Sequence, residues 1–126
     1  MKHGNVKNFN DLSVKIGCDI VKVKRFEKIS RESLLKIFHE IEFKNVKHET
    51  LAGMFAAKES CRKVFNDLRW HDMMITKSKN GKPILKILQA TKINSKILSH
   101  DLSISHDGDY AMAIVVFLML RKENVE

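Results

Sequence analysis

The strongest constraint on the fold is an apolar run near the C-terminus, AMAIVVFLML, which spans Ala111 to Leu120. A helix that crosses a membrane needs about 20 such residues, and this run has about half that length. It is therefore interpreted as a buried strand. The preceding segment, Leu102 to Ser105, is predicted to be a second strand, joined to the run by a turn at HDGD. The chain must then contain a sheet that other elements cover.

Two further regions have the pattern of strands. Residues from Ser13 to Cys18 alternate between apolar and polar, which predicts a strand that ends at Asp19. The segment from Trp70 to Ser78 alternates more loosely and predicts another strand. It is followed by Asn80-Gly81, the strongest short hairpin signal in the chain. The apolar residues of Ile84 to Ile87 are expected to begin the returning strand.

Three segments have helical character. Ser30 to Lys44 places apolar residues at helical spacing, with Ser30 as the predicted N-cap and Ser33 as the alternative. His48 to about Asn66 predicts a second and longer helix, and residues 90–99, ATKINSKILS, are expected to form a short one. The order of the elements predicts one α+β domain of 126 residues, in which an antiparallel sheet packs against the long helix and the shorter helices.

The composition bounds the partners. The chain has 23 lysines and arginines against 15 aspartates and glutamates, a net charge of +8, which predicts nucleic acid, a phosphorylated small molecule or an acidic protein as partner. Cys18 and Cys61 lack metal-ligand spacing and are expected to be reduced, buried and small hydrophobes, so no zinc site is expected. The start of the chain lacks the apolar core of a secretory signal, which makes the cytoplasm the expected compartment.

Charged residues gather in the long predicted helix, in the stretch FAAKESCRKVF. Lys58, Glu59 and Lys63 lie close to its apolar residues, which a merely solvated helix face does not require. A carboxylate at a strand end and one on a helix, here Asp19 and Glu59, are the usual minimum for holding Mg²⁺ beside substrate phosphates. The two lysines could neutralise phosphate oxygens, and backbone N–H groups around Gly81 could approach an anion closely.

Each of these residues also has a simpler interpretation. Asp19 could be an ordinary carboxylate at a strand end, and Glu59 could pair with Lys63 one helical turn later. The loop at Gly81 could be a plain turn, and His106 could be a turn histidine whose ring is satisfied locally. Taken together, the residues favour a magnesium and phosphate site over four unrelated surface features.

Four motifs follow one another along the chain: IGCDIVKVKRF, LAGMFAAKESCRKVF, ITKSKNGKPIL and LSISHDGDYAMAIVVF. They resemble the GxDxxxxxR motif, the AGRFAAKEA…K helix, the NGKP loop and the SISH segment of the holo-[acyl-carrier-protein] synthase family. KIFHEIE also resembles a family helix that ends in a glutamate, with Glu42 in that place. The resemblance spans roughly Lys15 to Leu118, and four ordered motifs at compatible spacing make it specific.

The resemblance implies a 4′-phosphopantetheinyl transferase of the short, trimer-forming type, with the fold of that family. Such enzymes transfer phosphopantetheine from coenzyme A to a serine of apo acyl carrier protein and release adenosine 3′,5′-bisphosphate, in support of fatty acid biosynthesis. By this analogy Asp19 and Glu59 bind Mg²⁺, and Lys63 holds the pyrophosphate as the third catalytic residue. Coenzyme A is expected to contact Lys63 and, at its nucleotide end, Lys58, Gly81, Lys82, Pro83 and His106. In the family the site lies between subunits.

The general base stays open. Attack on the β-phosphoryl group develops charge that Mg²⁺ and lysine can stabilise, and the serine hydroxyl must lose its proton. Glu59, acting through a water on the metal, is the first candidate. His106 and Asp107 are the alternatives.

A basic run follows Asp19. Lys22, Lys24, Arg25 and Lys28 come directly after it, and an acidic acyl carrier protein would be drawn to such a patch. Lys22, Arg25 and Lys28 are therefore predicted to contact the carrier protein. The alternative is that these charges only solvate the start of a helix.

Three features depart from the family pattern. Met54 stands where the family usually has arginine, with Arg62 as a candidate substitute. The connection from Glu42 to Leu51 is short, and residues 1–12 form an extension before the usual family start.

Two other classes of function stay open. One alternative is another Mg²⁺-dependent phosphotransferase or phosphoesterase. The other, a small basic nucleic-acid-binding domain, is disfavoured by the single Trp and single Tyr available for stacking. Neither nucleic acid nor a membrane is expected as a partner.

Overall fold

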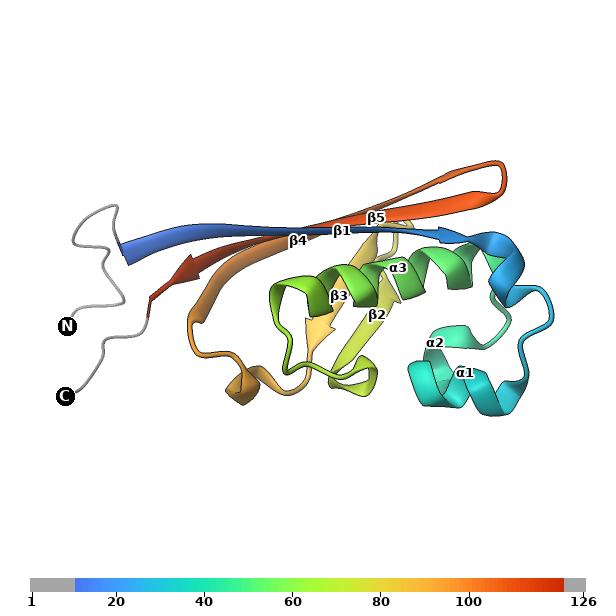
Figure 1. The fold of residues 1–126 in the computed structure, drawn as a ribbon, viewed down its shortest axis with the longest axis horizontal. Helices are drawn as coiled ribbons and strands as arrows, with labels where there is room; N and C mark the ends of the chain where they lie inside the picture. Colours follow the sequence, from blue (N-terminus) through green and yellow to red (C-terminus); the bar gives the residue numbers. More distant parts are fainter. Residues whose placement is uncertain (1–10, 122–126) are drawn as a thin grey trace.

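The structure is a computed structural model that describes residues 11–121. Its main sheet is antiparallel, with the strand order β1-β5-β4. These strands are β1 (Leu12–Lys22), β4 (Lys96–Asp107) and β5 (Tyr110–Leu120). The long helix α3 (His48–Val64) packs along one face of the sheet (Figure 1). The α+β fold is therefore confirmed, and the apolar run predicted to be a buried strand is the central strand β5.

Alternate residues of β5 divide the main sheet into a buried and an exposed face. One set faces α3 and is at most 1% exposed: Ala111, Ala113, Val115, Phe117 and Met119. The opposite face, called here the outer face, leaves large apolar side chains of β1 and β5 exposed: Val14, Ile16, Ile20, Tyr110, Met112 and Val116. Cys18 is also exposed, so the expectation that both cysteines are buried is wrong for Cys18 and holds for Cys61. Within the described part of the chain, no element covers the outer face.

The segment predicted as one helix, Ser30 to Lys44, forms two short ones. They are α1 (Arg31–Ile37) and α2 (Glu40–Phe43). The predicted N-cap is confirmed, because the Ser30 hydroxyl accepts a hydrogen bond from the backbone N–H of Ser33 at 3.1 Å. The helical spacing of the apolar residues therefore continues across a break that the pattern does not reveal.

The break between these helices lies at Phe38 and His39. Phe38 has an extended backbone and a fully buried side chain, so the chain leaves the helix to place this ring in the core. The backbone N–H of His39 donates to the Glu42 carboxylate at 2.7 Å, which starts the next helix. Core packing and a new cap together outweigh continuation of the helix.

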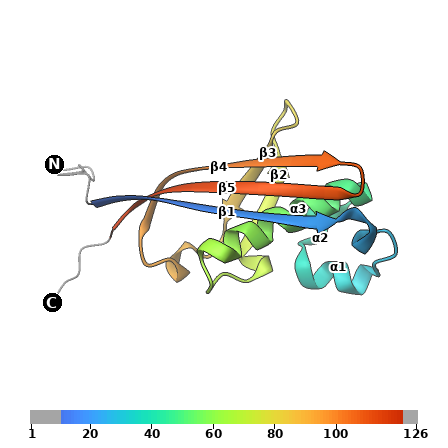
Figure 2. The ribbon, with the colours of Figure 1, turned by 45° about the horizontal axis from the view of Figure 1, so that its top comes forward.

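The predicted hairpin is confirmed. The strands β2 (Met73–Lys77) and β3 (Pro83–Ile87) pair in a separate antiparallel sheet, after the 3₁₀ turn η3 (Trp70–Asp72). Gly81 in the connecting loop has a φ of 85°, a conformation that other residues adopt only under strain. Figure 2 shows this hairpin beyond β4, on the side of the main sheet away from β1.

The prediction of a short helix at residues 90–99 is wrong. Only a 3₁₀ turn, η4 (Ala90–Lys92), forms there, and β4 begins at Lys96. Lys96 pairs with Leu120, and the register shifts between Ile97 and Ser99. Pairing with the apolar central strand therefore outweighs the local helical pattern.

The backbones of β1 and α3 touch at Gly17. A Cβ atom at this position would lie 2.1 Å from the carbonyl oxygen of Ser60 and 3.0 Å from a methyl carbon of Val64, so only glycine fits. The Ser60 side chain is fully buried, and its hydroxyl donates to the Ala56 carbonyl at 2.7 Å. The strand and the helix are therefore held together next to two predicted site residues, because Asp19 lies two residues after Gly17 and Glu59 directly precedes Ser60. Across residues 11–121, no helix has the length and apolar character needed to cross a bilayer.

Candidate active site

A surface pocket of about 540 Å³ lies where β1 meets the C-terminal part of α3. It is called here the carboxylate pocket, and its lining residues are Asp19, Glu59, Arg62, Lys63 and Asn66. The structure thus brings together Asp19, Glu59 and Lys63, the three residues predicted to be catalytic. The prediction that the strand ends at Asp19 is wrong, because β1 continues to Lys22 and Asp19 pairs with Ala113 inside the sheet.

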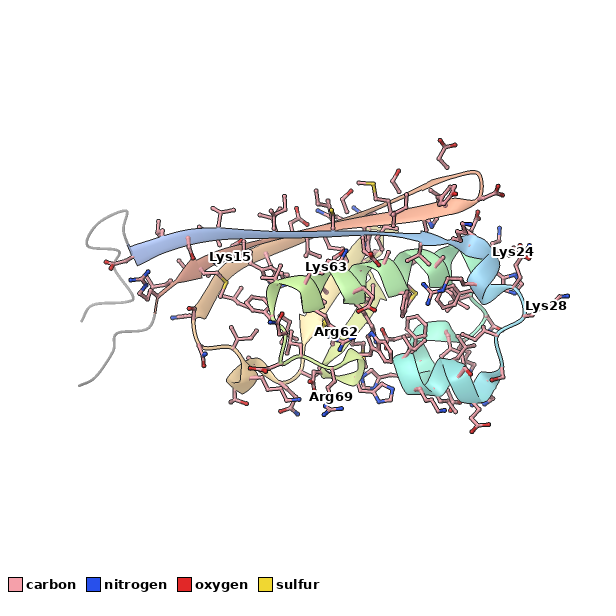
Figure 3. The ribbon with its side chains drawn as sticks, viewed as in Figure 1. Lys15, Lys24, Lys28, Arg62, Lys63 and Arg69 are labelled. Carbon is pink, nitrogen blue, oxygen red and sulfur yellow. The ribbon has the colours of Figure 1, made fainter. Side chains whose placement is uncertain are left out.

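Each carboxylate in this pocket has a cationic partner. The Lys63 amine lies 3.1 Å from Asp19 Oδ1 and donates to the Cys18 carbonyl at 2.9 Å. Arg62 Nη1 lies 3.1 Å from Glu59 Oε2. In Figure 3, Lys63 lies beside β1 and Arg62 lies on the side of α3 away from the main sheet. The simpler interpretation, a pair between Glu59 and Lys63, is wrong because each residue contacts a different partner.

The donor set of the carboxylate pocket fits a magnesium ion. Mg²⁺ prefers oxygen ligands, is usually held by one or two carboxylates, and keeps several waters. The side chains of Asp19 and Glu59 are 19% and 27% exposed, so an ion between them could keep water and meet a phosphate. Residues 11–121 contain no group of three or more His, Cys, Asp and Glu residues placed to hold a metal. The described protein ligands would therefore be these two carboxylates.

Lys58 does not face a ligand, which corrects the prediction that it binds the nucleotide. Its side chain is fully buried, and its amine donates to Glu42 Oε1 at 2.7 Å and to the carbonyls of Ile37 at 3.0 Å and Trp70 at 3.1 Å. These contacts occupy its three donors. Burial lowers the pKa of the Lys58 amine, and the hydrogen bond and negative charge of Glu42 oppose that shift. Lys58 is a structural residue.

Glu42 completes this buried ion pair. Besides Lys58, its carboxylate accepts from the backbone N–H of His39 at 2.7 Å and from that of Ile75 at 2.9 Å. One side chain therefore joins α2, α3 and β2. The available sequence signal was the resemblance of KIFHEIE to a family helix that ends in a glutamate, with Glu42 in that place.

Most of the residues predicted for the nucleotide end of coenzyme A line a second pocket, of about 480 Å³. Gly81 and Pro83 contribute to it from the hairpin, and His106 from the end of β4. It is called here the hairpin pocket. His106 Nε2 lies 2.8 Å from the Glu49 carbonyl oxygen, so this nitrogen carries a proton and donates it. The alternative that His106 is a turn histidine with a locally satisfied ring is wrong, because His106 lies in β4 and its partner Glu49 is 57 residues away in the sequence.

The two pockets open at opposite edges of the main sheet. β1, which carries Asp19, is one edge strand, and β4, which carries His106, is the other. α3 packs against the sheet (Figure 2), and it lines the hairpin pocket with Met54 and the carboxylate pocket with Glu59 and Lys63. Lys82 lines a neighbouring hollow on the hairpin side, where it pairs with Asp101 at 3.1 Å. One chain alone therefore does not join the residues of the hairpin to the carboxylate pocket.

The basic run predicted to contact a carrier protein lies at the far end of β1. Lys22 ends that strand, and Arg25 belongs to the 3₁₀ turn η2 (Val23–Phe26). Lys22, Arg25 and Lys28 are all exposed, and Figure 3 shows Lys28 projecting from this end of the molecule. The Arg25 guanidinium is held 5.1 Å above the ring of Phe55, which positions its charge.

Arg62 does not replace the family arginine at Met54. Met54 lines the hairpin pocket, whereas Arg62 lines the carboxylate pocket. Sequence reasoning considered Arg62 only as that substitute and missed its place beside Glu59. The spacing of three residues on a helix was the available signal, since residues three apart share a helix face.

Comparison with known proteins identifies the family. Residues 15–115 match the model of the 4′-phosphopantetheinyl transferase superfamily. The holo-[acyl-carrier-protein] synthase of Sulfurimonas denitrificans is 36% identical over 110 residues, which cover 79% of this chain and 91% of the relative. That of Campylobacter jejuni is 36% identical over 117 residues, covering 83% and 100%.

Solved structures agree with the sequence relatives. The crystal structure of Helicobacter pylori holo-[acyl-carrier-protein] synthase in complex with coenzyme A has a TM-score of 0.71 at 32% identity, and covers 82% of this chain and 99% of its own. The Bacillus anthracis synthase in complex with CoA (3′,5′-ADP) has a TM-score of 0.67 at 31% identity, with coverages of 82% and 94%. Sequence and fold agree over most of the length, and this chain therefore belongs to the holo-[acyl-carrier-protein] synthases of the 4′-phosphopantetheinyl transferase superfamily.

Proposed function

We propose that the protein transfers the 4′-phosphopantetheine group of coenzyme A to a serine of an acidic apo acyl carrier protein, in a reaction that requires Mg²⁺ and supports fatty acid biosynthesis in the cytoplasm. The observation that carries the proposal is the carboxylate pocket, which gathers Asp19, Glu59 and Lys63. Relatives solved with coenzyme A support the choice of donor substrate. Family membership favours this reaction over an unrelated phosphotransferase or a nucleic-acid-binding module.

The pocket residues have distinct parts in this reaction. Asp19 and Glu59 hold Mg²⁺, which supplies positive charge at the pyrophosphate oxygens. The Lys63 side chain is 58% exposed, so its amine can turn from Asp19 to a phosphate oxygen. The serine oxygen bonds to the β-phosphorus, the bond from that phosphorus to the bridging oxygen breaks, and adenosine 3′,5′-bisphosphate leaves with the electron pair.

The proton of the serine hydroxyl needs an acceptor. Glu59 is our first candidate, through a water, because it lies in the carboxylate pocket. His106 and Asp107 come from the opposite edge of the sheet and would have to act from a neighbouring subunit. His106 would accept through Nδ1, since its Nε2 donates to the Glu49 carbonyl.

We further propose that the protein works as a homotrimer with each site shared between subunits. Two observations support shared sites: the pockets lie at opposite edges of one sheet, and the outer face leaves Val14 67%, Ile16 64% and Val116 38% exposed. A large uncovered apolar face is typical of an interface. The predicted contribution of Ala111 to Leu120 would come from the residues that point outward. The number three rests on the family resemblance.

The carrier protein is proposed to dock on the basic run. Lys22, Arg25 and Lys28 present exposed positive charge just beyond the strand that carries Asp19. An acidic partner would be steered to this end by charge complementarity, and its serine would then be near the carboxylate pocket.

The test of the reaction is incubation with coenzyme A, Mg²⁺ and an apo acyl carrier protein, followed by mass spectrometry of the carrier. We expect a gain of one phosphopantetheine. Asp19→Ala and Glu59→Ala should each lower turnover by at least about 100-fold while the fold is kept, because each removes half of the protein's metal ligands. A carrier whose mass does not change, or near-normal turnover by either variant at low Mg²⁺, would contradict the assignment.

The shared site has its own test. Glu59→Ala and His106→Ala should each be nearly inactive alone, because each spoils one of the two pockets in every subunit. If sites form between subunits, a mixed trimer contains some sites with both pockets intact. Mixing the two variants after brief dissociation should then restore part of the activity, up to about a quarter in a random mixture. Mixtures that stay inactive although subunits exchange, as mass spectrometry can verify, would show that the sites are not shared in this way.

A further inference from the structure

We propose that Arg62 couples the binding of metal to the binding of phosphate in the carboxylate pocket. The inference rests on the proposed function, since it takes Mg²⁺ and the pyrophosphate of coenzyme A as the ligands of that pocket. Arg62 would weaken metal binding while the phosphate is absent and strengthen phosphate binding once the metal has arrived.

Arg62 is held in place by three contacts. Its Nη1 lies 3.1 Å from Glu59 Oε2, its Nε donates to the Leu68 carbonyl at 3.0 Å, and its guanidinium lies 5.0 Å from the centre of the Trp70 ring. Its side chain is 36% exposed. Arg62 is therefore a fixed, partly covered charge, unlike the more exposed amine of Lys63, which has a flexible stem.

The charges of the pocket cancel. Asp19 and Glu59 bring two negative charges, and Arg62 and Lys63 bring two positive ones. A divalent cation that enters this neutral pocket alone gains little from its net charge and must take Glu59 away from Arg62. The cation and a pyrophosphate with two negative charges, entering together, leave the pocket neutral again. Each ligand therefore improves the binding of the other, which is a linkage between the two.

The guanidinium can serve both states. It presents five N–H donors in a planar fork, so it can hold the Leu68 carbonyl and still offer donors to another group. When Glu59 turns to a metal, the Arg62 donors released from it belong to a side chain that lines the pocket, so a phosphate oxygen bound there could accept from them. Glu59 and the phosphate then alternate as the anionic partner of Arg62.

The experiment measures binding rather than turnover, with Mn²⁺ as the probe. The electron paramagnetic resonance signal of free Mn²⁺ gives its affinity for the whole protein, in the absence and presence of coenzyme A. For Arg62→Gln we expect Mn²⁺ to bind about fivefold more tightly without coenzyme A, the size of effect seen when one partly exposed ion pair is removed. The increase in Mn²⁺ affinity caused by coenzyme A should shrink by a similar factor.

Arg69→Gln is the matched control, because it removes the same charge from a neighbouring exposed arginine that does not line the pocket. Figure 3 shows Arg69 on the same side of the molecule as Arg62. This variant should bind Mn²⁺ within twofold of the unmodified protein. Arg62→Met, which keeps an apolar stem against Trp70, is the second variant and should behave like Arg62→Gln if the charge matters.

The outcomes are separable. If Mn²⁺ affinity without coenzyme A stays within twofold in both Arg62 variants, or the effect of coenzyme A on it is unchanged, Arg62 only holds the segment at Leu68 and the inference is refuted. If the unmodified protein binds neither Mn²⁺ nor coenzyme A, the proposed function itself fails.

Discussion

Replacing Lys58 with methionine is expected to cost about 3–5 kcal/mol of the free energy of unfolding, the usual range when one partner of a buried ion pair is removed. The reason is that Glu42 would stay buried with two backbone N–H donors and no cation. The carbonyls of Ile37 and Trp70 would also lose their donor. A domain of this size is stable by about 5–15 kcal/mol, so the loss is a large share of the total.

The assay is thermal unfolding, followed by circular dichroism. At about 4 °C per kcal/mol, the melting temperature should fall by roughly 12–20 °C. The matched control is Arg31→Met, since Arg31 and Glu40 also form an ion pair, at 2.9 Å, but their side chains are 61% and 66% exposed. That variant should lose no more than about 1 kcal/mol. Lys58→Met combined with Glu42→Gln should recover part of the loss, because the uncompensated charge is gone.

Two results would refute this reasoning. A Lys58→Met protein within about 1 kcal/mol of the original would mean that Glu42 is not left uncompensated. A variant of normal stability that binds coenzyme A poorly would restore Lys58 as a nucleotide contact.

Three further predictions concern other parts of the molecule. Arg25→Glu should raise the KM for carrier protein about tenfold or more and leave the KM for coenzyme A within twofold. Added salt should weaken carrier use in the original protein. Steady-state kinetics with each substrate varied separately measures both effects. Ile16→Asp places a charge on the apolar outer face and should convert a trimer to monomers, which sedimentation equilibrium measures; a trimer of unchanged stability would exclude this face as the interface. Lys92→Met should remove about 1 kcal/mol of stability at neutral pH. Burial alone would raise the pKa of Asp72, but the hydrogen bond from Lys92 and the backbone N–H of Arg69 bring that pKa below its usual value. The pKa of Asp72 is lower in the folded state than in the unfolded state. The stability that Lys92 contributes is therefore present above the unfolded-state pKa and is lost as pH falls through the folded-state pKa. The unfolding curves of the variant and the original protein should then converge in acid.

The sequence predicted those parts of the fold that depend on local pattern. The central strand, the long helix, the hairpin at Gly81 and the N-cap at Ser30 all follow from residues close together in the chain. It failed where a distant partner decides. The chain breaks at Phe38 to bury a ring in the core, and Lys96 pairs with Leu120, a contact that no local window contains.

The candidate site shows the same division. The motifs identified Asp19, Glu59 and Lys63, and the structure places them in one pocket. The motifs also predicted that Lys58 contacts the nucleotide. Lys58 is the same residue type as Lys63, but its side chain points into the core. A motif records which residues occur together and does not record which of them face a ligand, because a buried lysine that holds Glu42 and an exposed lysine that holds phosphate look alike in sequence.

The contact at Gly17 bears on which metal ion the proposed site would accept. Gly17 lies two residues before Asp19, and its neighbour Ser60 follows Glu59 directly, so the closeness of the two backbones sets the separation of the two carboxylates. A methyl group at Gly17, 2.1 Å from the Ser60 oxygen, would have to move away by at least about 1.3 Å to reach the ordinary contact distance of 3.4–4 Å, which would push strand and helix apart. Mg²⁺ demands oxygen ligands at about 2.0–2.1 Å, whereas Ca²⁺ accepts them at about 2.3–2.6 Å in looser arrangements. Discrimination between the two ions by size would then depend on a residue that has no side chain and touches neither ion.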